Sequence, residues 1–419
     1  MNIQITPKPL KGRIPSISSK SHAHRLMIAA SLCEEPCQVH ISDMNQDLEA
    51  TQNCLMQLSD ESPVLDCHES GSTLRFLLPI AMALKNQASF FGSGRLPERP
   101  LSPLKEELEA HGCTFTTETD ISFPPFDGST LIYTGTGRLK GGAFQLPGNV
   151  SSQYITGLLF ALPLLKEDSS ITLTSKLESS GYVRLTLEVL ECFGIRIRQE
   201  FSKNPKREQE TLYSFVIKGN QKYKSPGEVT AEGDWSNGAF WIVADALSSF
   251  SQRTSEPSVS CLNLNKNSAQ GDKAILSFVR AVRQTKKSKE KLVFDASEVP
   301  DLVPILAVLA ASREGITEIT HAGRLRIKES DRLATVHELI GSLGGDITEL
   351  PEGLVINGTG KLRGGTVNGH NDHRIVMSAA IASILCTEPV IILGAEAADK
   401  SYPKFFEDFT RLGGEFHVL

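Results

Sequence analysis

An internal repeat constrains the fold of this chain more than any other feature of its sequence. The segment GTGRLKGG at residues 135–142 recurs as GTGKLRGG at residues 358–365, and the two copies differ only by exchanges of Arg and Lys. Each copy follows a short apolar run, 131–133 or 354–356, that favours a β-strand, and each precedes a polar loop and an apolar helix. Self-similarity of this kind indicates a duplicated structural unit. The chain is therefore expected to form two related halves.

Six segments are apolar on nearly every side of a helix, so each is expected to be a helix buried inside a domain. They are residues 26–32, 76–84, 154–165, 239–247, 302–311 and 375–385. Strand-like segments and glycine-containing turns alternate with these helices, which indicates an α/β fold. A boundary near residues 223–227 would divide the six helices into three and three. The sequence thus predicts two similar lobes.

The polar residues that precede these apolar helices suggest binding of anions. A helix N-terminus carries unpaired N–H groups and a partial positive charge, which attract anions. Ser, Asp and Asn at such positions also cap helices, so capping remains the alternative for any one helix. Lys20, Arg25, Arg75 and Arg374 oppose the helix dipole. Bound anions account better for cations at these positions.

Composition limits the possible partners. The chain has 419 residues, 43 basic and 49 acidic side chains and a net charge of -6, whereas nucleic-acid binders usually carry a basic excess. No nucleic-acid partner is expected. No apolar run approaches the roughly 20 residues that span a bilayer, so no membrane association is expected either. Residues 1–7 alternate like a strand and lack the pattern of a signal peptide, which predicts a cytoplasmic protein.

Familiar nucleotide and metal motifs are absent from the sequence. Residues 358–361 resemble part of a P-loop, but Val355 occupies the position of its first Gly, and Leu362 that of its Ser or Thr. Neither copy of the repeat completes a dinucleotide fingerprint. His370 and His373 have no companion cluster of metal ligands, and there is no C-x-x-C pair. The sequence therefore supports none of these familiar sites.

The basic segment at residues 324–332, RLRIKESDR, is a candidate site for a phosphate or a carboxylate. Arg324, Arg326 and Lys328 alternate with apolar residues, which predicts a strand with three cations on one face. A solvated charged surface is the alternative. The polar residues 202–211 are predicted to be a solvated loop.

Two carboxylates are candidates for acid and base chemistry. Glu329 lies beside Lys328 and near Arg332, and Asp301 precedes a wholly apolar helix, where an idle carboxylate would be costly. Two carboxylates in different roles are suited to proton transfer on a small molecule.

Eight motifs resemble the EPSP synthase family, whose members join phosphoenolpyruvate to shikimate 3-phosphate. In order they are SKS at 19–21 with Arg25, GSTLR at 71–75, LPERP at 96–100, SSQ at 151–153, VPD at 299–301, KESDR at 328–332, DHR at 372–374 and KSYP at 400–403. The order and spacing extend over nearly the whole chain.

The resemblance implies a particular architecture. It is a two-lobed inside-out α/β barrel, in which each lobe has three βαβαββ units around buried helices. One lobe would comprise residues 1–17 plus 228–419 and the other residues 18–227, with crossovers near 16–19 and 224–231. The active site would lie in the cleft between the lobes, and the protein is expected to be a monomer.

The resemblance also implies the residues that bind the two small anionic substrates. Shikimate 3-phosphate would be held by Ser21, Arg25, Ser151, Ser152, Gln153, Ser179, Tyr182 and Lys328, with Asp301. Phosphoenolpyruvate would be held by Lys20, Gly71, Arg99, Gln153, Arg332, Arg374 and Lys400.

The family mechanism assigns catalytic roles to Asp301, Glu329 and Lys20. The 5-hydroxyl attacks C2 of phosphoenolpyruvate while C3 is protonated, and the tetrahedral intermediate then loses phosphate. Glu329 would be the acid toward C3, and Asp301 with Lys20 would accept the hydroxyl proton. The herbicide glyphosate occupies the phosphoenolpyruvate site in this family, and insensitive members often have Ala where this chain has Gly71.

Two positions depart from the common family pattern, and two other functions remain possible. Glu69 and Arg324 occupy positions that are often Asn. The sister enzyme that acts on UDP-N-acetylglucosamine usually has a Cys in the loop that corresponds to residues 92–103, and this chain has none there. A non-catalytic anion-binding protein on the same fold would be expected to lack Asp301 or Glu329.

Overall fold

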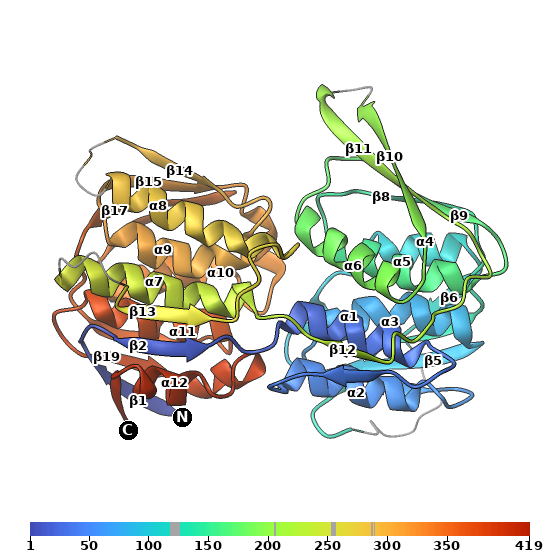
Figure 1. The fold of residues 1–419 in the computed structure, drawn as a ribbon, viewed down its shortest axis with the longest axis horizontal. Helices are drawn as coiled ribbons and strands as arrows, with labels where there is room; N and C mark the ends of the chain where they lie inside the picture. Colours follow the sequence, from blue (N-terminus) through green and yellow to red (C-terminus); the bar gives the residue numbers. More distant parts are fainter. Residues whose placement is uncertain (118–125, 205–206, 253–256, 286–287, 289) are drawn as a thin grey trace. The chain divides into compact units, whose positions relative to one another are not determined.

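The chain folds into two compact units with separate hydrophobic cores. The computed structural model describes residues 1–117, 126–204, 207–252, 257–285, 288 and 290–419. One unit contains residues 1–19 and 232–419, and the other contains residues 20–231. These divisions lie two and four residues from the boundaries that the family resemblance implies. Both units combine mixed sheets with many helices, so the α/β prediction is confirmed (Figure 1).

The unit of residues 20–231 contains two four-stranded sheets and one parallel pair of strands. The first sheet has the order β4 (Val64–Asp66), β5 (Gln87–Gly92), β7 (Thr130–Gly137), β6 (Cys113–Thr116). The second has the order β10 (Ile197–Asn204), β11 (Arg207–Ile217), β9 (Ser169–Leu173), β8 (Ala143–Leu146). The parallel pair is β3 (Gln38–His40) with β12 (Glu228–Thr230).

The unit of residues 1–19 and 232–419 contains the same set of sheets. The first has the order β14 (Leu292–Asp295), β15 (Glu314–Thr320), β17 (Gly353–Thr359), β16 (Asp346–Leu350). The second has the order β18 (Gly365–Asn368), β19 (Val390–Leu393), β1 (Asn2–Thr6), β20 (Glu415–Val418). The parallel pair is β2 (Gly12–Pro15) with β13 (Val259–Leu262). Each four-stranded sheet in both units has one parallel pair and two antiparallel pairs.

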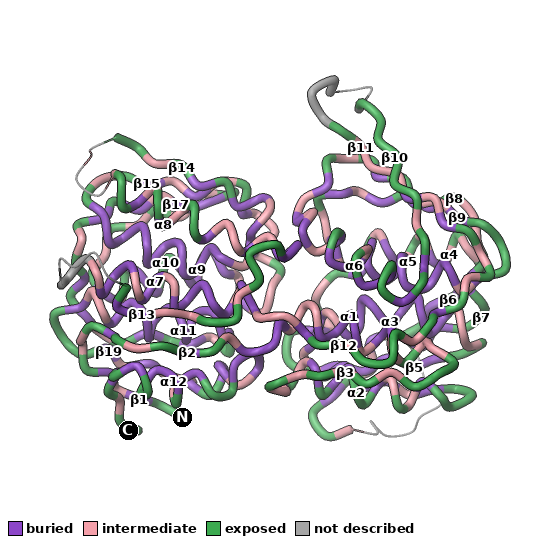
Figure 2. Tube along the Cα trace, viewed as in Figure 1, coloured by how far each residue is buried: buried purple, intermediate pink, exposed green. Residues whose placement is uncertain are grey.

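The six predicted apolar helices are all present. They are α1 (Lys20–Ser31), α3 (Gly71–Leu84), α5 (Ser152–Ala161), α7 (Trp235–Gln252), α9 (Val303–Ala311) and α11 (His373–Ala382). Every residue of α9 and α11 is buried, and Figure 2 shows the same concentration of buried residues along α5. α1 is less buried than predicted, because Ser31 is exposed and Met27 and Ala30 are half-buried.

More amphipathic helices accompany these six. They are α2 (Gln46–Gln57), α4 (Leu104–Ala110), α6 (Ser180–Cys192), α8 (Ile275–Thr285), α10 (Arg332–Ser342) and α12 (Phe405–Arg411). The order β4-α3-β5-α4-β6-β7 in one unit matches β14-α9-β15-α10-β16-β17 in the other. The duplication inferred from the repeat is therefore visible in the order of the elements.

The two copies of the repeat also share backbone conformations that only glycine adopts easily. Gly137 and Gly360 have φ of +84° and +78°, and Gly142 and Gly365 have φ of +144° and +151°. An L side chain is strained in this region of φ, so both copies need glycine at both positions. The matching conformations explain why these glycines recur.

Three local predictions were wrong. Residues 202–204 and 207–211 belong to the hairpin of β10 and β11, whereas 205–206 lie outside the described residues. The segment after each repeat begins with a short strand, β8 or β18, before the loop and helix. Residues 323–327 form the 3-10 helix η5 (Gly323–Ile327), not a strand. Because a 3-10 helix has three residues per turn, Arg324, Arg326 and Lys328 do not share one face.

Candidate active site

The first candidate residue, Lys20, begins α1 and forms an ion pair with α2. Its Nζ atom donates to Asp47 Oδ2 at 2.7 Å, and both side chains are largely buried. Asp47 lies in the first turn of α2, where a carboxylate interacts favourably with the helix dipole. The Lys20–Asp47 pair therefore joins the starts of two helices. No role was predicted for Asp47, although an acidic residue in a first helical turn is a recognisable signal.

Arg25 connects α1 with α5 and α6. Its guanidinium donates to Ser21 O at 2.6 Å, Thr186 Oγ1 at 2.8 Å, Tyr182 O at 3.2 Å and Thr156 Oγ1 at 3.3 Å. Burial lowers the pKa of Arg25 to about 10, which still leaves the group charged at neutral pH. These contacts bring Ser21 and Tyr182, both predicted site residues, into one region.

The start of α3 brings Gly71 close to two arginines. Ser70 caps this helix by accepting from Thr73 N, and Gly71 is the first helical residue. A Cβ atom added at Gly71 would lie 2.4 Å from Arg75 Nη1 and 2.9 Å from Arg99 Nη1. Gly71 therefore allows two guanidinium groups to approach the N-terminus of α3, where the helix dipole attracts anions.

The predicted residues Ser151, Ser152 and Gln153 lie at the start of α5. Ser151 caps the helix by accepting from Gln153 N at 3.3 Å, and Ser152 is buried. The Gln153 side chain donates to Ser72 Oγ at 2.9 Å, so the starts of α5 and α3 are joined. Ser179 precedes α6 with φ of +54°, a conformation that costs a non-glycine residue about 1–2 kcal/mol.

In the other unit, Arg332 is the centre of a buried ionic cluster. Its side chain is 1% exposed and lies in the first position of α10. Nε donates to Asp372 Oδ2 at 2.8 Å, Nη1 donates to Asp301 Oδ1 at 2.9 Å, and Nη2 forms an ion pair with Glu329 Oε2 at 2.7 Å. Burial opposes the charge, but the three carboxylates raise the pKa of Arg332 above its ordinary value.

Asp301 lies within this cluster. It belongs to η4 (Pro300–Leu302), immediately before α9. Its carboxylate faces Lys328 Nζ at 3.6 Å and Arg374 Nη2 at 3.7 Å in addition to Arg332. Burial by itself would raise the pKa of Asp301, but Lys328, Arg374 and Arg332 together hold it well below its usual range. Asp301 is therefore ionised and available to accept a hydrogen bond.

Asp372 is a member of this cluster to which the sequence assigned no role. It caps α11 by accepting from Arg374 N at 3.0 Å, and its side chain is fully buried. Burial alone would raise the pKa of Asp372, but the adjacent Arg332 guanidinium lowers it. The signal in the sequence was an Asp immediately before an apolar helix, which is typical of a capping residue.

Arg374 and Lys400 also converge on the start of α11. Arg374 Nη1 donates to Asp301 O at 2.9 Å, and Nη2 donates to Ser236 Oγ at 2.8 Å. Lys400, the last residue of η7 (Ala395–Lys400), donates to Asn371 O at 2.9 Å. The structure thus brings Asp301, Lys328, Glu329, Arg332 and Arg374 together, with Lys400 bound beside the same helix start.

Arg324, which departs from the family pattern, and Arg326 both bind within their own surroundings. Arg324 donates to Ser297 O at 2.6 Å, and Arg326 contacts Asp331, Glu349 and the Leu350 carbonyl. Neither arginine therefore contributes to the predicted basic face that would bind a phosphate or a carboxylate. The predicted basic face is replaced by the cluster around Arg332.

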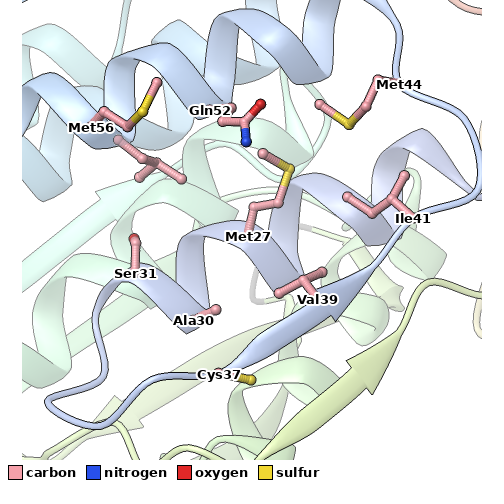
Figure 3. Close-up of a pocket in the computed structure, with 10 residues that line it drawn as sticks. Met27, Ala30, Ser31, Cys37, Val39, Ile41, Met44, Gln52 and Met56 are labelled. Carbon is pink, nitrogen blue, oxygen red and sulfur yellow. The ribbon is translucent and has the colours of Figure 1, made fainter.

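A pocket of about 420 Å³ between α1, α2 and β3 does not fit anionic substrates (Figure 3). Its lining is mostly carbon and sulfur, with Gln52 and Ser31 as the polar side chains; the lining residues are Met27, Ala30, Ser31, Cys37, Val39, Ile41, Met44, Gln52, Leu55 and Met56.

Within the described ranges, no His, Cys, Asp and Glu side chains gather as a metal site. No helix of the described chain could cross a membrane.

Comparison with known proteins identifies relatives along the whole chain. Residues 5–409 match the family model described as EPSP synthase (3-phosphoshikimate 1-carboxyvinyltransferase). The chain is 41% identical to the 3-phosphoshikimate 1-carboxyvinyltransferase of Clostridium novyi (strain NT), over 99% of this chain and 98% of that protein. It is also 41% identical to the protein of the same name from Clostridium perfringens (strain ATCC 13124 and its synonyms), over 98% of each chain.

Solved structures share the fold at lower sequence identity. The EPSP synthase of Acinetobacter baumannii matches with a TM-score of 0.75 and 22% identity, and the match covers 100% of both chains. The enolpyruvyl transferase NikO of Streptomyces tendae matches with a TM-score of 0.72 and 17% identity, over 99% of this chain and 98% of that one.

Proposed function

Because this chain belongs to the EPSP synthase (3-phosphoshikimate 1-carboxyvinyltransferase) family, we propose specific roles for its residues in the family reaction. The protein is an enzyme of that kind: it transfers the enolpyruvyl group of phosphoenolpyruvate to shikimate 3-phosphate, in the shikimate pathway of aromatic amino acid biosynthesis. The ionic cluster around Arg332 is the observation on which the residue roles depend. It combines two half-buried carboxylates, Asp301 and Glu329, with cations that suit an anionic substrate.

The proposed binding roles divide the site residues between the two substrates. Shikimate 3-phosphate is bound by Ser21, Arg25, Ser151, Ser152, Gln153, Ser179, Tyr182 and Lys328. Phosphoenolpyruvate is bound by Lys20, Gly71, Arg99, Gln153, Arg332, Arg374 and Lys400. The support is chemical: arginine forks match carboxylate and phosphate groups bidentately, and helix starts favour anions.

Asp301, assisted by Lys20, accepts the proton of the 5-hydroxyl in this proposal. The low pKa of Asp301 makes it a weak base in the free site, because Lys328, Arg374 and Arg332 stabilise its charge. Substrate anions that pair with the same cations would weaken this stabilisation and raise the pKa of Asp301. Binding of phosphoenolpyruvate would thereby increase the basicity of Asp301 at the time when a base is needed.

Glu329 supplies a proton to C3 of phosphoenolpyruvate. The hydroxyl oxygen forms a bond to C2, the C2=C3 electron pair takes the proton, and a tetrahedral intermediate results. The Glu329 carboxylate then takes a proton back from C3, which restores the double bond while the C2–O bond to phosphate breaks and phosphate leaves. Cations near the leaving group stabilise its charge without covalent catalysis.

We also propose the detailed architecture of the protein, its oligomeric state and its location in the cell. The fold is the two-lobed inside-out α/β barrel, with three βαβαββ units around buried helices in each lobe. The lobes comprise residues 1–17 plus 228–419 and residues 18–227, and residues of both serve one reaction. The enzyme acts as a monomer in the cytoplasm, binds no nucleic acid and needs no metal or organic cofactor. The net charge of -6 supports the proposal on nucleic acid.

A phosphate-release assay tests the substrate assignment. The enzyme is supplied with phosphoenolpyruvate and either shikimate 3-phosphate or UDP-N-acetylglucosamine. Release of phosphate only with shikimate 3-phosphate is the expected result. Release only with the nucleotide sugar would indicate the sister activity, and release with neither would indicate an anion-binding protein.

A further inference from the structure

The Arg374 guanidinium is held in place by two elements other than its own helix. Its side chain is 7% exposed. Nη1 donates to the backbone oxygen of Asp301, in η4, at 2.9 Å, and Nη2 donates to Ser236 Oγ, in the first turn of α7, at 2.8 Å. Two donors on different nitrogens are thus fixed. The direction of the remaining donors depends on these two contacts, because the guanidinium is planar and rigid.

Behind Ser236 lies a carboxylate that was not among the expected site residues. Asp272 belongs to η3 (Gly271–Ala274), is 3% exposed and accepts a hydrogen bond from the Ser236 side chain. A hydroxyl group has one proton. Because Ser236 Oγ accepts from Arg374, the Ser236 hydroxyl can donate its proton to Asp272. The three side chains therefore form a chain of donors that runs from Arg374 through Ser236 to Asp272.

The charge of Asp272 is supported by this arrangement. The pKa of Asp272 is raised to about 6, because burial and the nearby Asp301 carboxylate raise it by more than Arg374 and Ser236 lower it. Asp272 is consequently ionised in most molecules above neutral pH. A buried carboxylate is costly unless it is paired or hydrogen-bonded, and Arg374 with Ser236 supplies both kinds of interaction.

We propose that Asp272 is a positioning residue that acts through the Ser236 hydroxyl to orient the Arg374 guanidinium toward the anionic substrate. The inference depends on the proposed function, in which Arg374 binds phosphoenolpyruvate. Asp272 fixes the proton of Ser236, so that the oxygen of Ser236 presents a lone pair to Arg374. Without Asp272, the hydroxyl can rotate, and the contact between Ser236 and the Arg374 guanidinium is no longer fixed.

The test measures KM for each substrate and kcat in four variants, Asp272→Ala, Asp272→Asn, Ser236→Ala and the double variant Asp272→Ala/Ser236→Ala. Loss of one hydrogen bond to a charged group corresponds to about a tenfold change. Asp272→Ala and Ser236→Ala should each raise KM for phosphoenolpyruvate about tenfold, with a smaller change in kcat and in KM for shikimate 3-phosphate. The double variant should be no worse than either single variant, because all three interrupt one chain of contacts. Asp272→Asn keeps an acceptor for Ser236 and should restore most of the affinity.

Ser249→Ala is the matched control. Ser249 lies near the other end of the same helix, α7, and its hydroxyl donates to Asp245 Oδ1 at 3.3 Å. This variant removes the same kind of contact without affecting Arg374, so it should leave both KM values unchanged. If Asp272→Ala does not fold, Asp272→Leu replaces it, because leucine also lacks an acceptor for Ser236 but fills the buried space; an unchanged KM for phosphoenolpyruvate in that variant would overturn the inference.

Two results would overturn the inference. One is an unchanged KM for phosphoenolpyruvate in Ser236→Ala and Asp272→Ala. The other is a double variant whose KM rises by about the product of the two single effects, roughly a hundredfold, because independent sites would then be involved. Arg374→Lys separates this failure from failure of the proposed function. If Arg374→Lys raises KM for phosphoenolpyruvate while the other variants do not, only the role of Asp272 is wrong. If Arg374→Lys leaves it unchanged, the binding role of Arg374 is wrong.

Discussion

Gly71→Ala should weaken inhibition by glyphosate more than it weakens binding of phosphoenolpyruvate. The added Cβ atom would lie 2.4 Å from Arg75 Nη1 and 2.9 Å from Arg99 Nη1. Ordinary contacts between non-bonded heavy atoms begin at about 3.5 Å, so the two guanidinium groups must withdraw by about 1.1 and about 0.6 Å. Both atoms are the far ends of flexible side chains, so the variant should fold.

The displacement should alter function through the two arginines. Arg75 donates to Gly71 O and Pro100 O, each at 3.2 Å, and a shift of about 1 Å would disturb both bonds. A misplacement of this size can cost up to about a hundredfold in rate. We expect kcat/KM for phosphoenolpyruvate to fall between about tenfold and about a hundredfold. Glyphosate is longer than phosphoenolpyruvate and would meet the methyl group first, so its inhibition constant should rise by a larger factor.

Initial rates of phosphate release, measured against phosphoenolpyruvate at several glyphosate concentrations, test this prediction. The wild type should show competitive inhibition. Gly341→Ala is the control, since a Cβ atom at this position in α10 meets nothing within 4 Å. It should behave as the wild type does. A wild type that resists millimolar glyphosate, or a Gly71→Ala variant inhibited as strongly as the wild type, would refute the argument.

Three further predictions concern buried ionisable groups. Asp301→Ala and Glu329→Ala should each lower kcat by about a hundred- to ten-thousandfold. The affinity for shikimate 3-phosphate, measured by calorimetry, should fall much less. Near-normal turnover in either variant would contradict the role of that carboxylate. Asp372→Ala leaves the buried Arg332 without its bidentate partner, so urea denaturation should show a loss of about 3–5 kcal/mol in the free energy of unfolding, and an unchanged midpoint would count against this. Burial lowers the pKa of His24 to about 3, below its unfolded value of about 6.5, so the unfolded state binds the proton first. Stability should therefore be complete above pH 6.5 and fall by about 2 kcal/mol by pH 5, a dependence that His24→Gln should remove and that urea denaturation at both pH values can measure.

The helices could be predicted because their cause is local. An apolar run that continues around every side of a helix can only be buried, wherever the rest of the chain lies. The repeat at residues 135–142 and 358–365 was equally readable, since both copies need glycine where φ is positive. These features depend on neighbouring residues alone.

The prediction of a strand across Arg324 and Arg326 was wrong because the backbone conformation there does not depend on neighbouring residues alone. Alternation over five residues is compatible with more than one backbone conformation. Arg326 donates to Glu349 Oε1 at 2.7 Å and to the Leu350 carbonyl at 2.9 Å, and Leu325 is fully buried. The 3-10 helix at residues 323–327 therefore forms in contact with β16, a strand more than twenty residues away in the chain.

The positions of the polar helix starts, and the types of side chain found there, can be read from the amino-acid sequence. Which of these side chains meet depends on the packing of the helices. Arg332 contacts Asp301, Glu329 and Asp372 because the N-termini of η4, α10 and α11 lie close together in their unit. Lys20 meets Asp47, and Ser236 links Asp272 to Arg374, for the same kind of reason. Helix starts are encoded locally by caps and apolar runs, whereas the partner of each charge depends on how distant helices pack.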